Sequence, residues 1–336
     1  MQNRNQYFVT FDEISEMQRK VYFIDSVHHI LEERLTKFGF TCIDATQVPS
    51  EEILHYVKDA FGLVIRSKFT INQEKISQIL DLQFVARSGS GLENIDVTYC
   101  ESKGIQLFNS PEGNRNAVAE HALGSLLALL NKIPKANTEI RAGIWDRESN
   151  RGEELDGKIV GIIGFGNNGA AFAKKLQGFD VKVMAYDRYK QGFGTHFVQE
   201  CTLEAIQEQA DVISFHVPQN TETIYFLNES FIQKCQKPFY LLNLSRGKIV
   251  KTAALVSALK SNQIKGACLD VLEYEKTSFE SFFEAEHPED FKYLLDSANV
   301  ILSPHVGGWT TQSYFKLSNV LADKIIDYYT NNHPLV

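Results

Sequence analysis

The chain has 336 residues and a formal net charge of −8, a length that predicts two domains and an acidic balance that argues against a nucleic-acid partner. Its apolar and charged fractions, 43% and 23%, are those of a globular protein. The sequence contains no signal-type leader, no apolar run long enough to cross a membrane, and only five scattered cysteines without C-x-x-C spacing, so we expect a cytoplasmic protein with reduced thiols and no bound metal.

The first third of the chain alternates short apolar runs with helical patterns, which predicts a parallel, doubly wound α/β sheet. Helical patterns cover residues 27–38, where Gly39 provides the stop, and residues 50–60 and 72–80. The expected strands are residues 21–25, 40–43, 62–65, 84–86 and 106–108. Polar loops follow three of them, at residues 66–68, 87–91 and 109–114. Ligands bind at this edge of an open parallel sheet.

The segment 116–130 is rich in small and apolar residues and predicts a buried packing helix that Pro134 ends or bends. Because this helix is apolar on several sides, it needs partners on several sides. We therefore expect a subunit interface in this region and a homodimer.

The stretch from Ile159 to Asp187 predicts a strand, a tight turn, a helix and a second strand. Gly164, Gly166 and Gly169 have the spacing G-x-G-x-x-G, which alone is equally consistent with a plain tight turn. Asp187 follows about twenty residues later, where an acidic side chain accepts hydrogen bonds from an adenosine ribose. This context favours a dinucleotide site that binds NAD. The adjacent Arg188 leaves some tolerance for NADP open.

The segment that opens at Leu155 begins a second parallel sheet. Its further strands are expected at residues 212–217, 239–244, 265–271 and 300–303, with helices at 203–209 and 252–261. Residues 276–297 predict a loop with a short helix, and residues 311–329 predict a closing amphipathic helix.

Three ionisable residues lie just beyond successive strands of this second sheet: Arg246, Glu275 and His305. Taken singly, each has a plain explanation as a surface or loop residue. Together, at the edge that carries the glycine turn, they supply a cation for a carboxylate, a titratable base, and an acid that orients the base.

With these motifs in place, the sequence resembles the D-isomer-specific 2-hydroxyacid dehydrogenase family, and most of all its D-3-phosphoglycerate dehydrogenase branch. The resemblance runs from about Val21 to the end. It is carried by the glycine turn and by these segments: ARSGSGLENID from Ala86, FNSPEGNRNAVAEHALG from Phe108, HVP from His216, NLSRG from Asn243, LDVLEYE from Leu269 and SPHVGG from Ser303.

The resemblance implies roles for individual residues. Arg246, Glu275 and His305 would be the catalytic set, Asp270 would face the nicotinamide amide, and Pro218 and Thr223 would line the adenosine side. The remaining residues that we assign to the cofactor are Asn167, Asn168, Ser245 and Gly307. Those that we assign to the substrate are Ser88, Gly89, Ser90, Gly91 and Asn114, and also Arg66 and Arg87, with Lys68 nearby, as cations for a phosphate.

The resemblance also implies a domain layout and an activity. A flavodoxin-like substrate domain, residues 1–113 and 306–336, would carry an inserted Rossmann NAD-binding domain, residues 114–305, and domain closure would exclude water. We expect no C-terminal regulatory domain. Departures from the family pattern, such as Asn168 and Lys276, should alter local packing or access and not the reaction. The expected reaction is NAD-dependent oxidation of a D-2-hydroxyacid, with 3-phosphoglycerate as the leading substrate. A glyoxylate or hydroxypyruvate reductase and an NAD-sensing corepressor-like protein remain alternatives.

Overall fold

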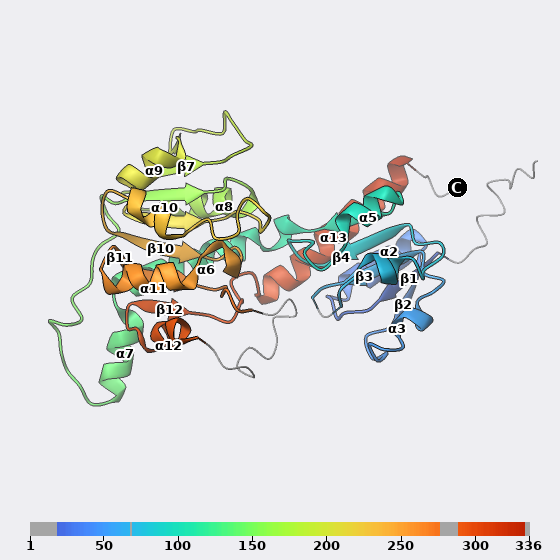
Figure 1. Ribbon diagram of the computed structural model, residues 1–336. Helices are drawn as coiled ribbons and strands as arrows, with labels where there is room; N and C mark the ends of the chain where they lie inside the picture. The colour runs from blue at the N-terminus through green and yellow to red at the C-terminus, as the bar shows by residue number, and fades with distance from the viewer. Residues whose placement is uncertain (1–18, 68, 276–287, 333–336) are drawn as a thin grey trace, which may run out of the picture. The chain divides into compact units, whose positions relative to one another are not determined.

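The computed structural model describes residues 19–67, 69–275 and 288–332. The chain forms two compact units. Unit 1 comprises Met1–Gly113 and Tyr314–Val336, and unit 2 comprises Asn114–Ser313. Each unit contains one parallel sheet with helices on both faces (Figure 1). The predicted α/β class with two doubly wound sheets is therefore confirmed.

Unit 1 contains five parallel strands in the order β2-β1-β3-β4-β5. Successive side chains of these strands point to opposite faces of the sheet and belong to two separate hydrophobic cores, one on each face. Because all five strands are parallel, the segments that follow β3, β4 and β5 begin at the same edge of the sheet, and the strand order reverses between β1 and β3. The strands are β1 (Lys20–Phe23), β2 (Thr41–Asp44), β3 (Gly62–Ile65), β4 (Phe84–Arg87) and β5 (Gln106–Asn109).

The helices of unit 1 are of very different lengths. α2 (Ile30–Phe38) and α13 (Thr311–Asn332) contribute Leu31, Leu35, Leu321 and Ile325 to one core. α2 ends at Gly39, whose φ of 109° makes it the left-handed cap that the sequence predicted. The opposite face is covered by three short helices: α3 (Ile53–Tyr56), α4 (Gln73–Ile76) and α5 (Val97–Ser102).

Unit 2 contains seven parallel strands in the order β12-β11-β10-β9-β6-β7-β8. The order reverses between β6 and β9, the arrangement that places a nucleotide at the carboxyl ends of these two strands. The strands are β6 (Ile159–Ile163), β7 (Lys182–Tyr186), β8 (Val198–Glu200), β9 (Val212–Phe215), β10 (Phe239–Asn243), β11 (Ile264–Leu269) and β12 (Val300–Leu302).

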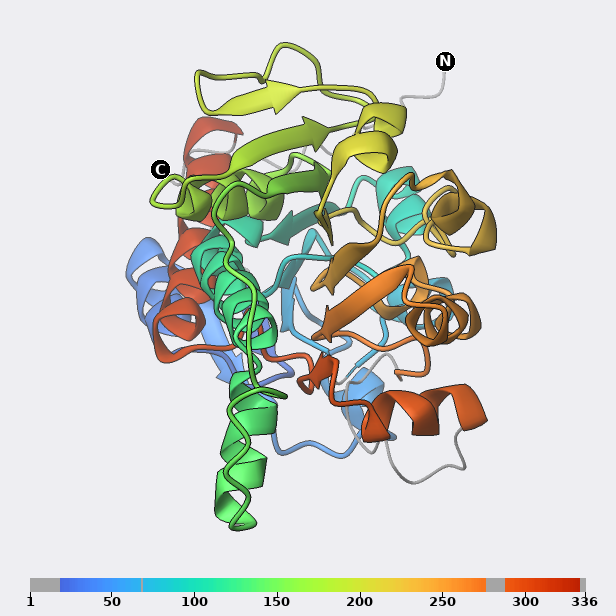
Figure 2. The same ribbon diagram turned by 90° about the vertical axis from the view of Figure 1, so that its left-hand side faces the viewer.

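Helices cover both faces of this sheet and bury two more cores. One face carries α6 (Pro111–Leu130) and α8 (Asn167–Leu176); the other carries α9 (Leu203–Gln209), α10 (Glu229–Lys234), α11 (Thr252–Lys260) and α12 (Glu289–Asp296). A further helix, α7 (Ile133–Arg141), extends away from the sheet together with the segment that follows it (Figures 1 and 2).

Three sequence-based expectations need correction. Residues 111–114 are not loop, because α6 begins at Pro111, a residue well suited to a first helical turn. α6 ends at Leu130, and Pro134 neither ends nor bends it but lies in the first turn of α7. The second boundary between the units falls at Ser313 instead of His305.

The shift of this boundary has a physical cause. The backbone amides of Val306 and Gly307 donate hydrogen bonds to Asp270, and Gly308 packs against Asn114. Residues 306–313 therefore belong to unit 2. The predicted 276–297 loop lies largely outside the described residues, and its described end contains α12.

Candidate active site and nucleotide pocket

The turn after β6 is built from three glycines with different local constraints. Gly164 has a φ of +94°, and a Cβ there would lie 2.6 Å from the carbonyl oxygen of His216. A Cβ at Gly169 would lie 2.1 Å from the carbonyl oxygen of Gly164, so only glycine lets α8 approach the strand this closely. A Cβ at Gly166 would meet no atom within 4 Å. The N-terminus of α8 therefore faces open space in which an anion fits.

A pocket lies beyond the ends of β6, β7 and β9. It contains five of the predicted cofactor residues: Gly164, Gly166, Asp187, Pro218 and Thr223. Further lining comes from residues that sequence reasoning did not single out, chiefly Tyr189, His216, Asn220 and Glu222.

The wall formed by residues 218–223 is held by a compact hydrogen-bond network. The Thr223 hydroxyl donates to the carbonyl oxygen of Pro218 at 2.6 Å. The Asn220 side chain accepts from the amides of Glu222 (2.9 Å) and Thr223 (3.1 Å). This network fixes the position of Glu222, whose carboxylate lies 3.1 Å from the Arg188 guanidinium.

Two polar atoms near this pocket are buried without a hydrogen-bond partner among the described residues: Oδ1 of Asn168 and Nδ1 of His216. Burial lowers the pKa of His216 to about 4, so the ring is neutral. Asn167, the first residue of α8, is exposed. Unsatisfied groups beside an open helix N-terminus fit a site built for a polar ligand.

His305 and Glu275 meet directly. The distance between His305 Nδ1 and Glu275 Oε2 is 2.8 Å, and both side chains are mostly buried. The other oxygen of Glu275 accepts a short hydrogen bond from the amide of Leu272, in its own loop. The carboxylate is thus fixed by its loop and orients the imidazole.

Arg246 is positioned by the NLSRG segment, in which the sequence reasoning assigned no role to Asn243. Asn243, at the end of β10, donates to the carbonyl oxygen of Arg246 at 3.0 Å, and its own side-chain oxygen accepts from the hydroxyl of Ser245 at 2.8 Å. A Cβ at Gly247 would lie 1.8 Å from the carbonyl oxygen of Leu272. The Arg246 loop therefore packs tightly on the loop that carries Glu275.

Asp270 is almost fully buried, and it organises the turn that carries His305. Its two carboxylate oxygens accept from the amides of Val306 (2.9 Å) and Gly307 (2.7 Å) and from the hydroxyl of Ser303 (2.6 Å). The expected contact of Asp270 with a nicotinamide amide remains a prediction.

Comparison with known protein families shows to which family the chain belongs. The sequence model of the D-isomer specific 2-hydroxyacid dehydrogenase NAD binding domain matches residues 123–307, more than half of the chain. The chain belongs to this family. The match confirms the family expected from the sequence and confirms NAD as the cofactor.

Two relatives illustrate the range of this family. Human D-3-phosphoglycerate dehydrogenase is 33% identical over 314 residues, which cover 92% of this chain and 56% of that protein. The chain thus spans little more than half the length of that relative. Glyoxylate reductase from Thermofilum pendens is also 33% identical, over 82% of this chain and 80% of its own length.

Solved structures of the family have the same fold. The structure of D-2-hydroxyisocaproate dehydrogenase matches with a TM-score of 0.78 and 25% identity, covering 94% of this chain and 98% of that one. D-lactate dehydrogenase from Aquifex aeolicus, solved with NAD and lactic acid, matches with a TM-score of 0.78 at 24% identity, covering 93% and 96% of the two chains. The latter likeness shows the fold alone.

The substrate residues expected in unit 1 differ in burial. Arg87, expected as a cation for a phosphate, is buried: its guanidinium donates to the carbonyl oxygens of Arg66 (2.9 Å) and Gly91 (2.6 Å). It therefore holds the 87–91 loop. The amides of Ser88 and Gly89 already donate to carbonyl oxygens within the unit, at 2.9 and 2.8 Å.

Three other expected substrate residues belong to different surroundings. Ser90 provides its carbonyl oxygen to the Asn109 side chain at 2.7 Å. Asn114 lies in α6 against Gly308, in unit 2. Lys68 lies outside the described residues.

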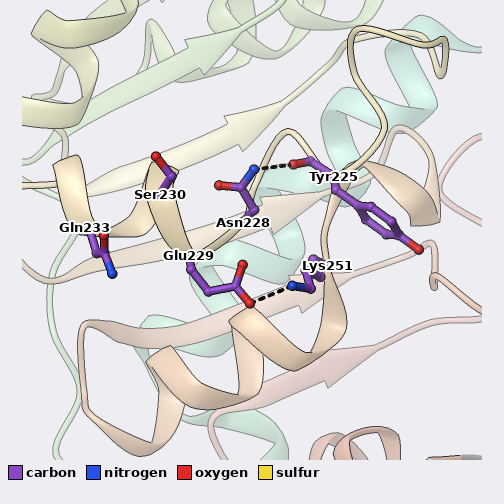
Figure 3. A pocket seen from close by; sticks show the side chains of 6 residues that line it. All are labelled: Tyr225, Asn228, Glu229, Ser230, Gln233 and Lys251. Atoms are coloured by element: carbon purple, nitrogen blue, oxygen red, sulfur yellow. Dashed lines mark hydrogen bonds and ion pairs between the residues drawn. The ribbon is translucent and has the colours of Figure 1, made fainter.

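A second, shallower pocket is formed by Tyr225, Asn228, Glu229, Ser230, Gln233 and Lys251 (Figure 3). Its Lys251 and Glu229 pair with each other at 2.7 Å, and Asn228 binds the carbonyl oxygen of Tyr225. None of the predicted site residues lines it. Within the described residues, no cluster of three metal-ligating side chains occurs and no helix is both long and apolar enough to cross a membrane.

Proposed function

We propose that the protein is an NAD-dependent dehydrogenase that interconverts D-2-hydroxyacids and 2-oxoacids, with 3-phosphoglycerate as its substrate. The observation that carries this proposal is the 2.8 Å contact between His305 and Glu275 at the sheet edge that also carries the glycine turn. A base oriented by a carboxylate is what removal of a hydroxyl proton requires.

Three residues of the chain have separate roles in the reaction. Arg246 binds the substrate carboxylate and polarises the C2 oxygen. Because the Nδ1 of His305 faces a carboxylate, that nitrogen carries the proton, and Nε2 accepts the proton of the substrate hydroxyl. Glu275 then stabilises the imidazolium that forms.

The cofactor would be held by the turn at Gly164 and Gly166, by the N-terminus of α8, and by Asp187 on the adenosine side. When bound, NAD supplies the hydride acceptor. The open space beside Gly166 and the unsatisfied side chain of Asn168 both support binding there.

The assignment of a phosphorylated substrate is supported by Arg66, which directly follows β3. The side chain is half-buried and burial lowers its pKa, with Asp25 and Tyr314 acting in the opposite direction. A cation partly withdrawn from water binds a phosphate more strongly than a solvated one does.

Turnover with a panel of 2-oxoacids and NADH tests this proposal. We expect the highest kcat/KM with 3-phosphohydroxypyruvate, and His305→Ala should lower kcat by about a hundred- to ten-thousandfold. The exposed His196 provides a matched control, His196→Ala, with kcat unchanged. A preference for glyoxylate or hydroxypyruvate would replace the assignment by a reductase. Tight NADH binding without turnover of any 2-oxoacid would favour a sensor.

We also propose a homodimer that forms through α7, not through α6, which buries Val118, Ala122 and Leu126 in the core of its own unit. Ile133 and Ile140 lie seven residues apart on one face of α7 and are about half exposed; Trp145, shortly after the helix, is 80% exposed. An apolar patch of this kind marks a protein interface.

Light scattering during size-exclusion chromatography tests the dimer. The double variant Ile140→Ser, Trp145→Ser should elute as a monomer, whereas Leu80→Ser, at an equally exposed apolar position of unit 1, should remain dimeric. A monomeric parent protein would refute the proposal.

A cytoplasmic location is supported by the five cysteines, all of which the structure describes and none of which forms a disulfide.

A further inference from the structure

We propose that His121, on α6, is a positioning residue for His305 and acts through a hydrogen-bonded chain of Ser303 and Asp270. The inference rests on the proposed function, because it concerns the turn that carries the acid–base histidine. His121 lies within the FNSPEGNRNAVAEHALG segment, where no role was assigned to it, and it does not line the nucleotide pocket.

The turn at His305 needs support. The φ of His305 is +56°, a left-handed conformation that is unfavourable for a residue other than glycine. Asp270 holds this conformation at three successive amides: its carbonyl oxygen accepts from His305 at 2.8 Å, and its carboxylate accepts from Val306 and Gly307. A Cβ at Gly307 would lie 2.8 Å from the carboxylate, so the clamp is close.

The position of this carboxylate is itself fixed from the other side. The hydroxyl of Ser303 donates to Oδ1 of Asp270 at 2.6 Å, and Nε2 of His121 lies 3.0 Å from the same hydroxyl oxygen. A serine hydroxyl has a single proton, which here goes to the carboxylate. The serine oxygen must therefore accept from Nε2–H of His121. His121 also lies 3.7 Å from Oδ1 itself.

The two ends of the chain differ in exposure. Asp270 is 3% exposed, whereas the side chain of His121 is 28% exposed. α6 packs into its core through Val118, Ala122 and Leu126 instead. Since these three residues supply the main core contacts of α6, we expect that replacing His121 changes the turn without unfolding the unit.

A matched pair of variants tests the proposal. His121→Leu removes the donor, and His121→Gln keeps an N–H donor at similar reach. We expect His121→Leu to lower kcat by about tenfold or more, since small misplacements of a reacting group are costly. His121→Gln should restore most of the loss. Glu120→Gln, which alters an exposed neighbour paired with Lys175, should have no effect.

A second readout does not need turnover. The amide protons of Val306 and Gly307 donate to a buried carboxylate, so in NMR spectra their signals should move and their exchange with solvent should quicken in His121→Leu but not in His121→Gln. If the two variants lose kcat equally, or if His121→Leu leaves both kcat and these amides unchanged, the proposal is wrong. If the parent protein turns over no 2-oxoacid, the proposed function fails, and the amide signals still decide the role of His121.

Discussion

Asp187, which directly follows β7, both orders the pocket loops and supplies a negative charge, so a substitution there changes both properties at once. Its carboxylate accepts from the amides of Phe165 (2.8 Å), Tyr189 (3.0 Å) and Lys190 (3.0 Å), so it holds the loops on which the adenosine side of the pocket is built. Replacing it would disturb the pocket as well as remove the charge. Glu222 provides a cleaner test of cofactor choice, because it pairs with Arg188 across the pocket wall.

We expect the parent protein to prefer NADH to NADPH, since Asp187 and Glu222 both repel a 2′-phosphate. Glu222→Gln should release Arg188 to bind that phosphate and raise kcat/KM for NADPH about tenfold, the scale of one charge-assisted hydrogen bond. The double variant Arg188→Ala, Glu222→Gln should show no such gain. Equal efficiency with both cofactors in the parent protein would contradict this explanation.

Residues whose role depends on local geometry were predictable from the sequence. The three glycines and the pair of Glu275 and His305 follow from spacing relative to strand ends, and the structure brings each of these sets together. Arg87 was not predictable, because a long cationic side chain becomes buried only when tertiary structure supplies carbonyl oxygens for its donors. Asn243 could have been suspected as a polar residue that ends a buried strand.

Among the elements of unit 2, the loops after β10 and β11 depend on one close approach. Gly247 lies against the carbonyl oxygen of Leu272, and Leu272 donates its amide to Glu275. This packing couples the position of Arg246 to that of Glu275. Any side chain at position 247 must push the two loops apart.

Gly247→Ala should therefore destabilise the protein by about 1–3 kcal/mol, the usual cost of overpacking, and lower kcat. Gly178→Ala is a suitable control, because a Cβ there meets no atom within 4 Å. Chemical denaturation and steady-state kinetics give the two readouts. Equal stability of the two variants would mean that the loops separate at no cost.

The sequence predicted strands better than helices. The expected strands match the observed ones within a few residues, because buried parallel strands are nearly continuous apolar runs. The helices expected at 50–60 and 72–80 reduce to single turns, α3 and α4. α5, α10 and the short edge strand β8 were not predicted, since segments this short carry too little periodicity. α7, which is as long as α2, was not predicted either.

At the scale of the whole molecule, His216 should affect how stability depends on pH. Its pKa is about 4 in the folded protein, because of burial, and 6.5 is the ordinary value. Between these values the unfolded chain binds a proton that the folded chain does not. Stability should therefore fall as the pH drops from 6.5 towards 4, by at most about 1.4 kcal/mol per pH unit from this residue.

His216→Gln removes this titration and should flatten the dependence of the unfolding free energy on pH within that window, whatever its effect on absolute stability. His196→Gln, at an exposed histidine of the same unit, should leave the slope as it is. Parallel curves for the parent and His216→Gln would show that His216 has the same pKa in the folded and the unfolded state.

In unit 2, the residues of the cofactor pocket and the proposed catalytic residues follow different strands of the same sheet. The glycine turn and the adenosine wall follow β6, β7 and β9, whereas Arg246, Glu275 and His305 follow β10, β11 and β12. A change confined to the second group leaves the walls of the pocket intact. His305→Ala should thus bind NADH without consuming it, and the fluorescence of the bound nucleotide would turn this protein into an equilibrium reporter of the free NADH concentration.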